Sequence, residues 1–182
     1  MTATKYLFDL GACLSTVEPS GSLNEAMDSC DALLRTLRQE GGVVHLVGNG
    51  GSSAIVAHAQ NDFVKGCDIR ALVYQDVPTL TAYANDIAYE NAYAEPLGLW
   101  LQSWDVVIAV SSSGASPNIL NAAMMAMGTA AAVITLSGFN PGNPLRKLGD
   151  VNFYVPSHDY GQVELTHAAL LHYLTDRLAH AG

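Results

Sequence analysis

The chain has 182 residues, of which 49% are hydrophobic and 14% are charged, and its formal net charge is -9. A chain of this length and composition can bury a hydrophobic core, which excludes an intrinsically disordered protein. The negative charge and the lack of a basic cluster argue against nucleic acid as a partner. No stretch predicts a secretion signal or a membrane span, so we expect a soluble, cytoplasmic protein without membrane partners.

Two helices are expected first, over residues 4–16 and 23–39, with Ser20 or Ser22 available to cap the second. Short β-branched runs then alternate with helical stretches. The expected strands comprise residues 43–47, 69–74, 106–110, 131–136 and 151–155. The helices between and after them comprise residues 52–65, 79–101, 117–127 and 162–180.

The expected strands are apolar without polar alternation, which is typical of parallel strands buried on both faces. Together with the βα order, this predicts the α/β fold class, as a three-layer αβα sandwich around a five-stranded parallel sheet. We expect one domain over residues 1–182. Residues 1–41 are predicted to form helices that pack against other subunits, and residues 42–182 the α/β core.

Two segments rich in Gly and Ser follow the first and third expected strands, where ligands of such sheets bind. They read Gly48-Asn49-Gly50-Gly51-Ser52-Ser53 and Ser111-Ser112-Ser113-Gly114-Ala115-Ser116-Pro117-Asn118. Glycines let the backbone approach an anion, and hydroxyls and helix N-termini donate hydrogen bonds without adding charge. Either loop alone could be an ordinary turn. The pair predicts a phosphate site, and the lack of a dinucleotide fingerprint or a P-loop Lys favours a compact sugar phosphate.

Histidines and carboxylates gather on two expected helices. His58 and Asp62 are four residues apart and project from one helix face, whereas Glu164 and His172 are eight apart on the last helix. Such residues are often only surface pairs or hydrogen-bonded core histidines. Because imidazoles and carboxylates are also common acid–base groups and metal ligands, these residues are catalytic candidates as well.

The two loops, with Leu80-Thr81-Ala82, Ala84-Asn85-Asp86 and Val155-Pro156-Ser157, occur in the order and spacing of the sugar isomerase (SIS) domain family. From residue 43 to residue 178 the chain resembles the phosphoheptose isomerase branch of that family. The resemblance implies that serines of both loops hold the phosphate and that Asn49 and Asp86 contact the open-chain sugar. The implied substrate-binding set is Asn49, Gly50, Gly51, Ser52, Asp86, Ser111, Ser112, Ser113 and Ser116.

In that branch a His and a Glu on one helix, and a Gln and a His on the last helix, converge as the catalytic centre and in some members bind zinc. The matching positions here are His58, Asp62, Glu164 and His172, so the chain departs from the pattern at Asp62 and Glu164. Two imidazoles and two carboxylates suit a divalent metal, and zinc is the leading candidate. We expect all four to bind it, with Asp62 or Glu164 as the general base and His172 as the second acid–base group.

The resemblance further implies isomerisation of a long-chain sugar phosphate, with sedoheptulose 7-phosphate to D-glycero-D-manno-heptose 7-phosphate as the leading reaction. It also implies a homo-oligomer, with a tetramer expected and with sites built at subunit contacts. Cationic residues of the family are absent at Gly66 and at Glu95-Pro96, which leaves a related ketose phosphate open. The alternative is a non-catalytic sugar-phosphate-binding or replication-initiator-associating regulator of the same fold. Such members typically lack the helix acid and the last-helix histidine.

Overall fold

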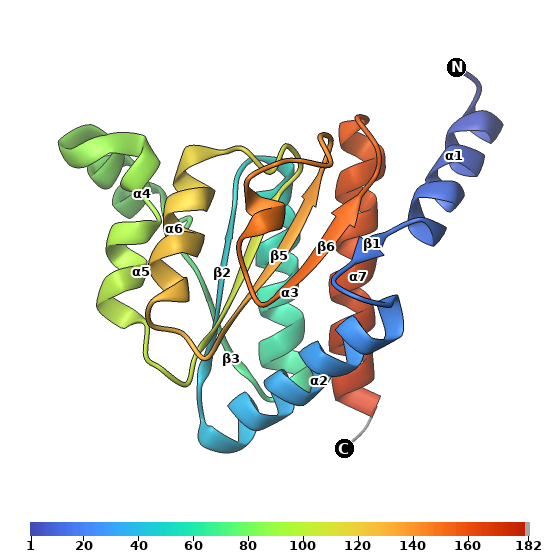
Figure 1. Ribbon diagram of the computed structural model, residues 1–182. Helices are drawn as coiled ribbons and strands as arrows, with labels where there is room; N and C mark the ends of the chain where they lie inside the picture. Colours follow the sequence, from blue (N-terminus) through green and yellow to red (C-terminus); the bar gives the residue numbers. More distant parts are fainter. Residues whose placement is uncertain (181–182) are drawn as a thin grey trace.

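The computed structural model describes residues 1–180 and arranges them in alternating helices and strands (Figure 1). The α-helices are α1 (Ala3–Ser15), α2 (Leu23–Glu40), α3 (Gly51–Cys67), α4 (Val77–Tyr83), α5 (Ala94–Trp100), α6 (Pro117–Met127) and α7 (Tyr160–His180). The strands are β1 (Glu18–Pro19), β2 (Val43–Gly48), β3 (Arg70–Val73), β4 (Val106–Ser111), β5 (Ala132–Gly138) and β6 (Val151–Val155). Shorter helical segments are the π-helix η1 (Ala84–Ala88) and the 3₁₀ helices η2 (Tyr89–Asn91) and η3 (Leu145–Lys147).

The strands form one sheet in the order β1-β6-β5-β4-β2-β3. Strands β2 to β6 run parallel to one another. In their register, Leu46 of β2 lies opposite Ile108 of β4 on one side and Val73 of β3 on the other. Their carboxyl ends therefore share one edge of the sheet, at the top of Figure 1. The segments that follow β2 and β4 both start at this edge.

Helices cover both faces of the sheet, which produces two hydrophobic cores. On one face α2, α3 and α7 bury side chains such as Phe63 and Leu174 against Ile108. On the other face Leu97 of α5 and Ile119 of α6 lie in the second core. The resulting three layers confirm the predicted α/β sandwich.

The sheet departs from the prediction at one edge, where a short sixth strand makes it mixed. Glu18 and Pro19 of β1 pair antiparallel with Tyr154 and Phe153 of β6. The prediction of an all-parallel, five-stranded sheet was wrong here, because the link between the first two helices was interpreted only as a helix breaker. Pro19 has no N–H to donate, and an edge strand tolerates such a residue.

The helix expected over residues 79–101 is in fact four segments: α4, η1, η2 and α5. Asp76 caps α4, and its carboxylate accepts a hydrogen bond from the Thr79 backbone at 3.2 Å. The helical course is first interrupted at Ala88, which is extended (φ −171°, ψ 146°). Pro96 accounts for the second interruption, since a proline is tolerated only in the first turn of a helix. It is the third residue of α5, so the chain has to begin a new helix just before it.

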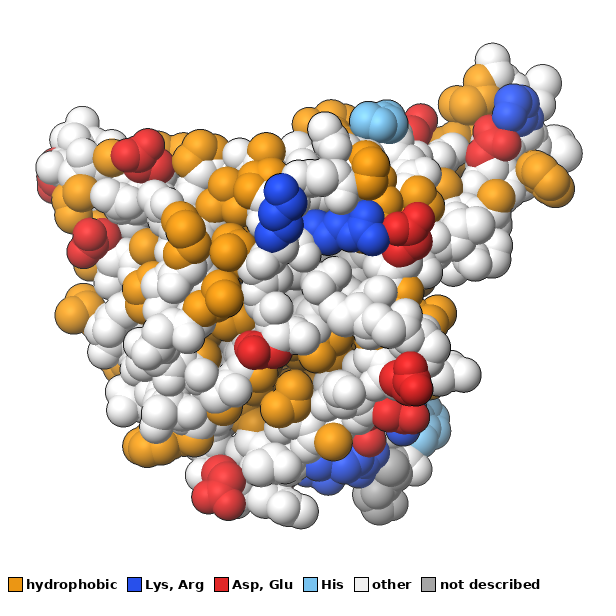
Figure 2. Space-filling model, in the orientation of Figure 1, with side chains coloured by type: hydrophobic (Ala, Val, Ile, Leu, Met, Phe, Trp, Pro, Cys, Tyr) orange, Lys and Arg blue, Asp and Glu red, His pale blue; other side chains and the backbone are white. Residues whose placement is uncertain are grey.

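Helix α1 projects from the sandwich and packs against α7 (Figure 1). Figure 2 shows hydrophobic side chains on this projecting helix, and Leu7 and Phe8 are 64% and 77% exposed. By contrast, α2 begins at a complete capping box formed by Ser22 and Glu25, which settles the choice between Ser20 and Ser22. Among residues 1–180, no helix has both the length and the apolar character to cross a membrane.

Candidate functional site

A polar cavity of about 240 Å³ lies at the carboxyl edge of the sheet, between the segments after β2 and β4 and the first turns of α7. All of the expected substrate-binding residues except Asp86 line it. The full lining is Asn49, Gly50, Gly51, Ser52, Ser111, Ser112, Ser113, Ser116, Tyr160 and Glu164. We call it the phosphate-loop cavity.

Serine hydroxyls make up one wall of this cavity. Ser111 Oγ lies 3.2 Å from Ser116 Oγ and 3.5 Å from Ser113 Oγ. Ser112 Oγ is buried without a hydrogen-bond partner among residues 1–180. None of the described lining residues is cationic, so an anion has to be held by hydroxyls and by the free N–H groups at the N-termini of α3 and α6.

Three glycines shape the backbone around the cavity. Gly50 (φ +55°) and Gly114 (φ +62°) have positive φ values, which other residues rarely adopt. A Cβ on Gly114 would also overlap Asn143, and a Cβ on Gly51 would overlap the carboxylate of Glu164. The loops therefore need glycine for the positive φ values of their turns. They also need it because the side chains of Asn143 and Glu164 lie directly against the backbone.

The contact with Gly51 places the Glu164 carboxylate at the N-terminus of α3. A negative charge is favoured at this end of a helix, because the macrodipole is positive there. Glu164 therefore lies in the phosphate-loop cavity and adds an acid to its otherwise neutral lining.

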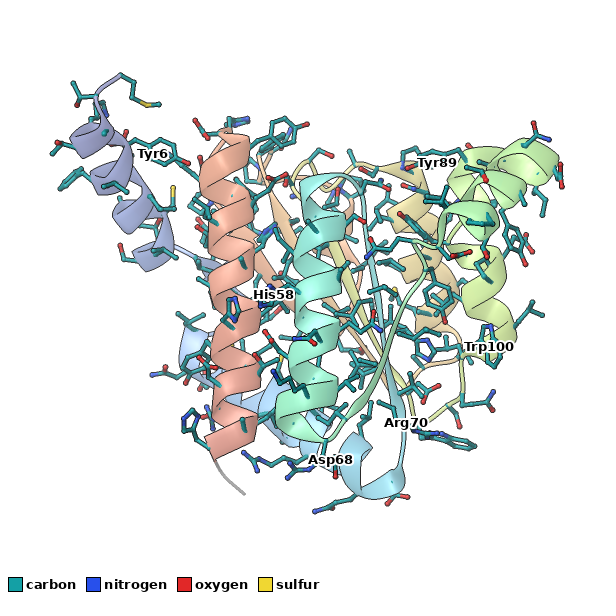
Figure 3. The ribbon with its side chains drawn as sticks, turned by 180° about the vertical axis from the view of Figure 1, so that it is seen from behind. Tyr6, His58, Asp68, Arg70, Tyr89 and Trp100 are labelled. Carbon is teal, nitrogen blue, oxygen red and sulfur yellow. The ribbon has the colours of Figure 1, made fainter. Side chains whose placement is uncertain are left out.

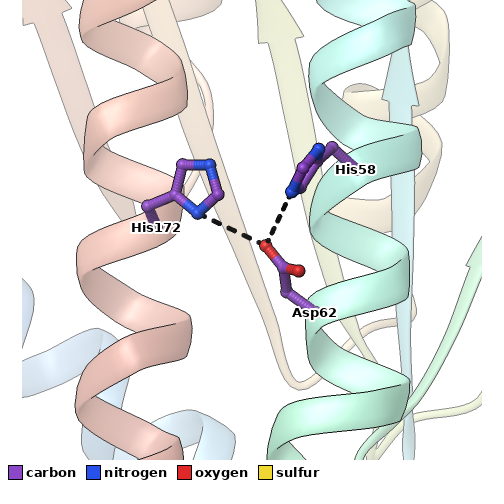
Figure 4. Close-up of side chains that lie close together, drawn as sticks. All are labelled: His58, Asp62 and His172. Carbon is purple, nitrogen blue, oxygen red and sulfur yellow. Dashed lines mark ion pairs between the residues drawn. The ribbon is translucent and has the colours of Figure 1, made fainter.

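A second candidate centre lies between α3 and α7. Figure 3 shows His58 between these two helices, and Figure 4 shows Asp62 between His58 and His172. His58 Nε2 and His172 Nδ1 each lie 3.4 Å from Asp62 Oδ2, and the ring centroids are 4.9 Å apart. The two imidazole side chains are 62% and 50% exposed, and Asp62 is 26% exposed. We call these three residues the His–Asp cluster.

The structure thus brings together three of the four expected metal ligands, with candidate ligand atoms that all lie within 4.8 Å of one another. Glu164 is not among them. Eight residues separate it from His172, a rise of about 12 Å along α7. The spacing puts both residues within about a quarter-turn of each other but two turns apart along the helix. The family resemblance, which pairs these two positions, is what predicted Glu164 as a ligand.

The structure also places Asp86 away from both centres. It is exposed on η1 and accepts a hydrogen bond from Asn85 Nδ2 at 2.8 Å. Two aromatic residues near the phosphate-loop cavity were missed. Tyr160 lines it, and Tyr89 donates a hydrogen bond to Asn49 Oδ1 at 3.0 Å. The only signal for Tyr89 was its position three residues after Asp86.

Two further histidines are buried and hydrogen-bonded. His167 Nε2 donates to the Ser137 carbonyl at 3.2 Å, and burial lowers the pKa of His167 to about 4. His45 lies between the Tyr74 hydroxyl, at 2.6 Å, and Asp105 Oδ2, at 3.1 Å, and burial lowers its pKa despite the carboxylate. Both imidazoles are therefore neutral parts of the core at pH 7.

The architecture and the position of the phosphate-loop cavity define the class of α/β proteins whose ligand sites lie at the carboxyl ends of parallel strands. The family model of the SIS domain matches residues 5–138. The chain belongs to the SIS domain family, in the branch that contains the phosphoheptose isomerases, which confirms the resemblance found in the sequence.

Two relatives and one solved structure show the extent of this similarity. A phosphoheptose isomerase of Thiobacillus denitrificans is 31% identical over 173 residues, which cover 85% of this chain and 88% of the relative. One of Helicobacter hepaticus is 31% identical, with 92% and 88% covered. The structure of phosphoheptose isomerase from Neisseria gonorrhoeae superposes with a TM-score of 0.85, at 23% identity, over 96% of this chain and 95% of that one. This structural match shows the shared fold.

Proposed function

We propose that this chain is an aldose–ketose isomerase of a long-chain sugar phosphate. Sedoheptulose 7-phosphate is the leading substrate, with D-glycero-D-manno-heptose 7-phosphate as its product, because the curated relatives carry the name phosphoheptose isomerase. The observation that carries the proposal is that α3 and α7 bear both an anion cavity and a carboxylate placed between two imidazoles.

Binding begins at the phosphate. The serine hydroxyls and the helix N-termini hold its oxygens, while Asn49 reaches the adjoining sugar oxygens. This anchor fixes one end of the open chain, so that the carbons to be isomerised are held near the acid–base groups.

Proton transfer then takes place at the other end of the sugar. The proximity of His172 to Asp62 favours this pair over Glu164 as the acid–base couple. Asp62 removes a proton from C1 of the ketose and returns it to C2, and His172 moves protons between the two oxygens. The intermediate is an enediolate. Glu164 lies beside the phosphate anchor, which in one subunit is the wrong end for this step.

The His–Asp cluster also fits a divalent metal. Two imidazole nitrogens and one carboxylate oxygen within 4.8 Å make a three-residue donor set, which is the usual protein contribution to a catalytic zinc site. A metal held by His58, Asp62 and His172 would polarise the sugar carbonyl and stabilise negative charge on its oxygens. Zinc is the leading ion because of the two imidazoles.

We further infer that active sites form between subunits. The His–Asp cluster lies about 12 Å along α7 from Glu164 of the same chain, and it is half exposed. A neighbouring subunit that packs on this surface would bring its own phosphate-loop cavity to the cluster.

We assign residues 1–182 to one domain. Its first 41 residues serve subunit packing through the exposed side chains of α1. We expect a cytoplasmic tetramer.

A non-catalytic regulator would need only the anion cavity. It has no use for a carboxylate held between two imidazoles, which is why we favour the enzyme. Turnover discriminates between the two functions.

The test is to incubate the purified protein with sedoheptulose 7-phosphate and to measure the aldose phosphate formed, with and without a chelator. We expect turnover that the chelator abolishes and added zinc restores, and near one metal per chain in the wild type but little in His58→Ala. Turnover that survives complete metal removal would contradict the metal. No turnover of any C5 to C8 ketose phosphate, with ligand binding retained, would favour the regulator.

A further inference from the structure

A second cavity, of about 420 Å³, adjoins the phosphate-loop cavity on the side of η1 and η2. Its lining is Asn49, Ala88, Tyr89, Glu90, Ser116, Pro117 and Asn118. Asn49 and Ser116 belong to both cavities, so Asn49 stands where a ligand anchored at the serines would pass from one to the other. Figure 3 shows Tyr89 at the same end of the sheet.

The orientation of the Asn118 amide is fixed by the backbone. The N–H of Ile119 is shared between the Ser116 carbonyl, at 3.1 Å, and Asn118 Oδ1, at 3.0 Å. A backbone N–H can only donate, so an amide nitrogen in the place of Asn118 Oδ1 would set two donors against each other. The oxygen of the Asn118 amide must therefore face Ile119, and its nitrogen must face the other way. Asn118 is 1% exposed, so water cannot substitute for this contact.

The Asn118 amide in turn fixes Asn49. Asn49 Nδ2 donates to Asn118 Oδ1 at 2.8 Å, and Asn118 Nδ2 donates to Asn49 Oδ1 at 2.9 Å. The hydroxyl of Tyr89 makes the second hydrogen bond to Asn49 Oδ1, at 3.0 Å. Both lone pairs of that oxygen are now used, and one N–H of the Asn49 amide is left.

We propose that Asn118 and Tyr89 lock Asn49 as a group that can only donate, and that its remaining N–H binds an acceptor oxygen of the sugar. This inference rests on the proposed function, since it concerns the sugar part of a sugar phosphate. Tyr89 is then a positioning residue: it reaches the ligand only through Asn49. Without the Asn118 donor the amide could rotate and present its oxygen instead. Without the Tyr89 hydroxyl one lone pair of Asn49 Oδ1 is left open, and an acceptor then stands beside the acceptor oxygen of the sugar.

The lock has a measurable consequence for the sugar but not for the phosphate. The phosphate binds to the serines and helix N-termini, whereas the hydrogen bond of the Tyr89 hydroxyl goes to Asn49. Removing the Tyr89 hydroxyl should therefore weaken binding of the ketose phosphate and leave binding of inorganic phosphate unchanged. A loss of one well-placed hydrogen bond corresponds to about three- to tenfold in affinity.

The experiment measures the affinities of the full-length protein for sedoheptulose 7-phosphate and for inorganic phosphate, under conditions without turnover. Tyr89→Phe should bind the ketose phosphate about three- to tenfold more weakly, with phosphate affinity within about twofold of wild type. Asn118→Asp keeps both acceptor contacts but loses the donor to Asn49 Oδ1, and should change affinity in the same direction. Tyr83→Phe is the control, since Tyr83 is the last residue of α4 and lines neither of the two cavities.

Equal ketose phosphate affinity in Tyr89→Phe and wild type would overturn the inference. A parallel loss of phosphate affinity would overturn it too, because it would indicate a general disturbance of the loops. The binding comparison holds whether or not the protein is an isomerase. Absent turnover with the predicted affinities contradicts only the proposed function, whereas a wild type that does not bind the ketose phosphate contradicts both.

Discussion

The phosphate-loop cavity and the His–Asp cluster both use residues of α3 and α7 but are built in different ways. The cavity is lined mostly by neutral groups, and its geometry comes from the backbone: strand ends, helix N-termini and glycines in conformations that other residues avoid. The cluster consists of charged or titratable side chains on exposed helix surfaces. The position of the phosphate-loop cavity is therefore determined by the topology of the sheet. The His–Asp cluster depends instead on how the faces of α3 and α7 meet and on what covers them.

The largest expected effect tests whether the two centres act together only across a subunit boundary. Ser111→Ala/Ser113→Ala removes hydroxyls of the cavity, and Asp62→Asn removes the acid of the cluster. Asp62→Asn alone should be nearly inactive, since loss of an acid–base group typically costs 10²- to 10⁴-fold. The serine variant alone should be nearly inactive at low substrate concentration, since it lacks the phosphate anchor. If sites are shared, mixed oligomers of the two variants should regain activity, because some sites combine an intact cavity with an intact cluster.

The mixing experiment is read by turnover after the two variants have been unfolded and refolded together. Each variant refolded alone is the control for incomplete inactivation. Mixed oligomers that stay as inactive as the separate variants would show that each site is complete within one chain. The substrate would then have to reach from the phosphate-loop cavity to the His–Asp cluster of the same chain.

A smaller effect should separate the histidines of α7. His167 is fully buried with its pKa lowered to about 4 from 6.5, whereas His172 is half exposed in the cluster. Below pH 6.5 the unfolded chain gains a proton on His167 that the folded chain does not bind. The free energy of unfolding should therefore fall as the pH falls from 6.5 to 4, by roughly 3 kcal/mol from this residue.

Denaturant unfolding at several pH values measures this contribution. His167→Gln cannot titrate, so its unfolding free energy should vary less over the same pH range than that of the wild type. Equal pH dependence of the two proteins would show that His167 is not kept neutral by burial. His172→Gln is the matched control, on the same helix but outside the core.

The sequence predicted the backbone-built part of the molecule well. The strand over residues 151–155 and the helix over residues 117–127 have the bounds that were expected, because β-branched runs and Pro117 mark them locally. Both loops were placed at strand ends for the same reason. The failures were the edge strand at Glu18 and Pro19 and the continuous helix over residues 79–101. The edge strand depends on a contact distant in sequence, whereas Pro96 is a local signal against a continuous helix. Glu164 as a fourth metal ligand stays a prediction, because within one chain it lies apart from the other three.

Glu164 illustrates why side-chain convergence is harder to predict than backbone placement. Helical periodicity gives the direction of a side chain, and Glu164 and His172 have similar directions. Periodicity does not say which neighbour receives the side chain. Here the space above Gly51 accepts the carboxylate, and that space exists only because a glycine without a Cβ stands at the start of α3.

The smallest expected effect comes from Glu164 itself and separates its two possible roles. If it only adds a negative charge to the phosphate-loop cavity, Glu164→Gln should bind inorganic phosphate about fivefold more tightly, because a like charge a few ångströms away in a wet site costs about 1 kcal/mol. Turnover should then change little. If Glu164 is the general base, reached by the sugar through a neighbouring subunit, turnover should fall by about 10² or more while phosphate affinity still rises. Glu95→Gln, an exposed acid outside both centres, is the control for the change in net charge. Unchanged phosphate affinity in Glu164→Gln would show that the carboxylate does not face the anion, and would move Glu164 out of the cavity in which the structure places it.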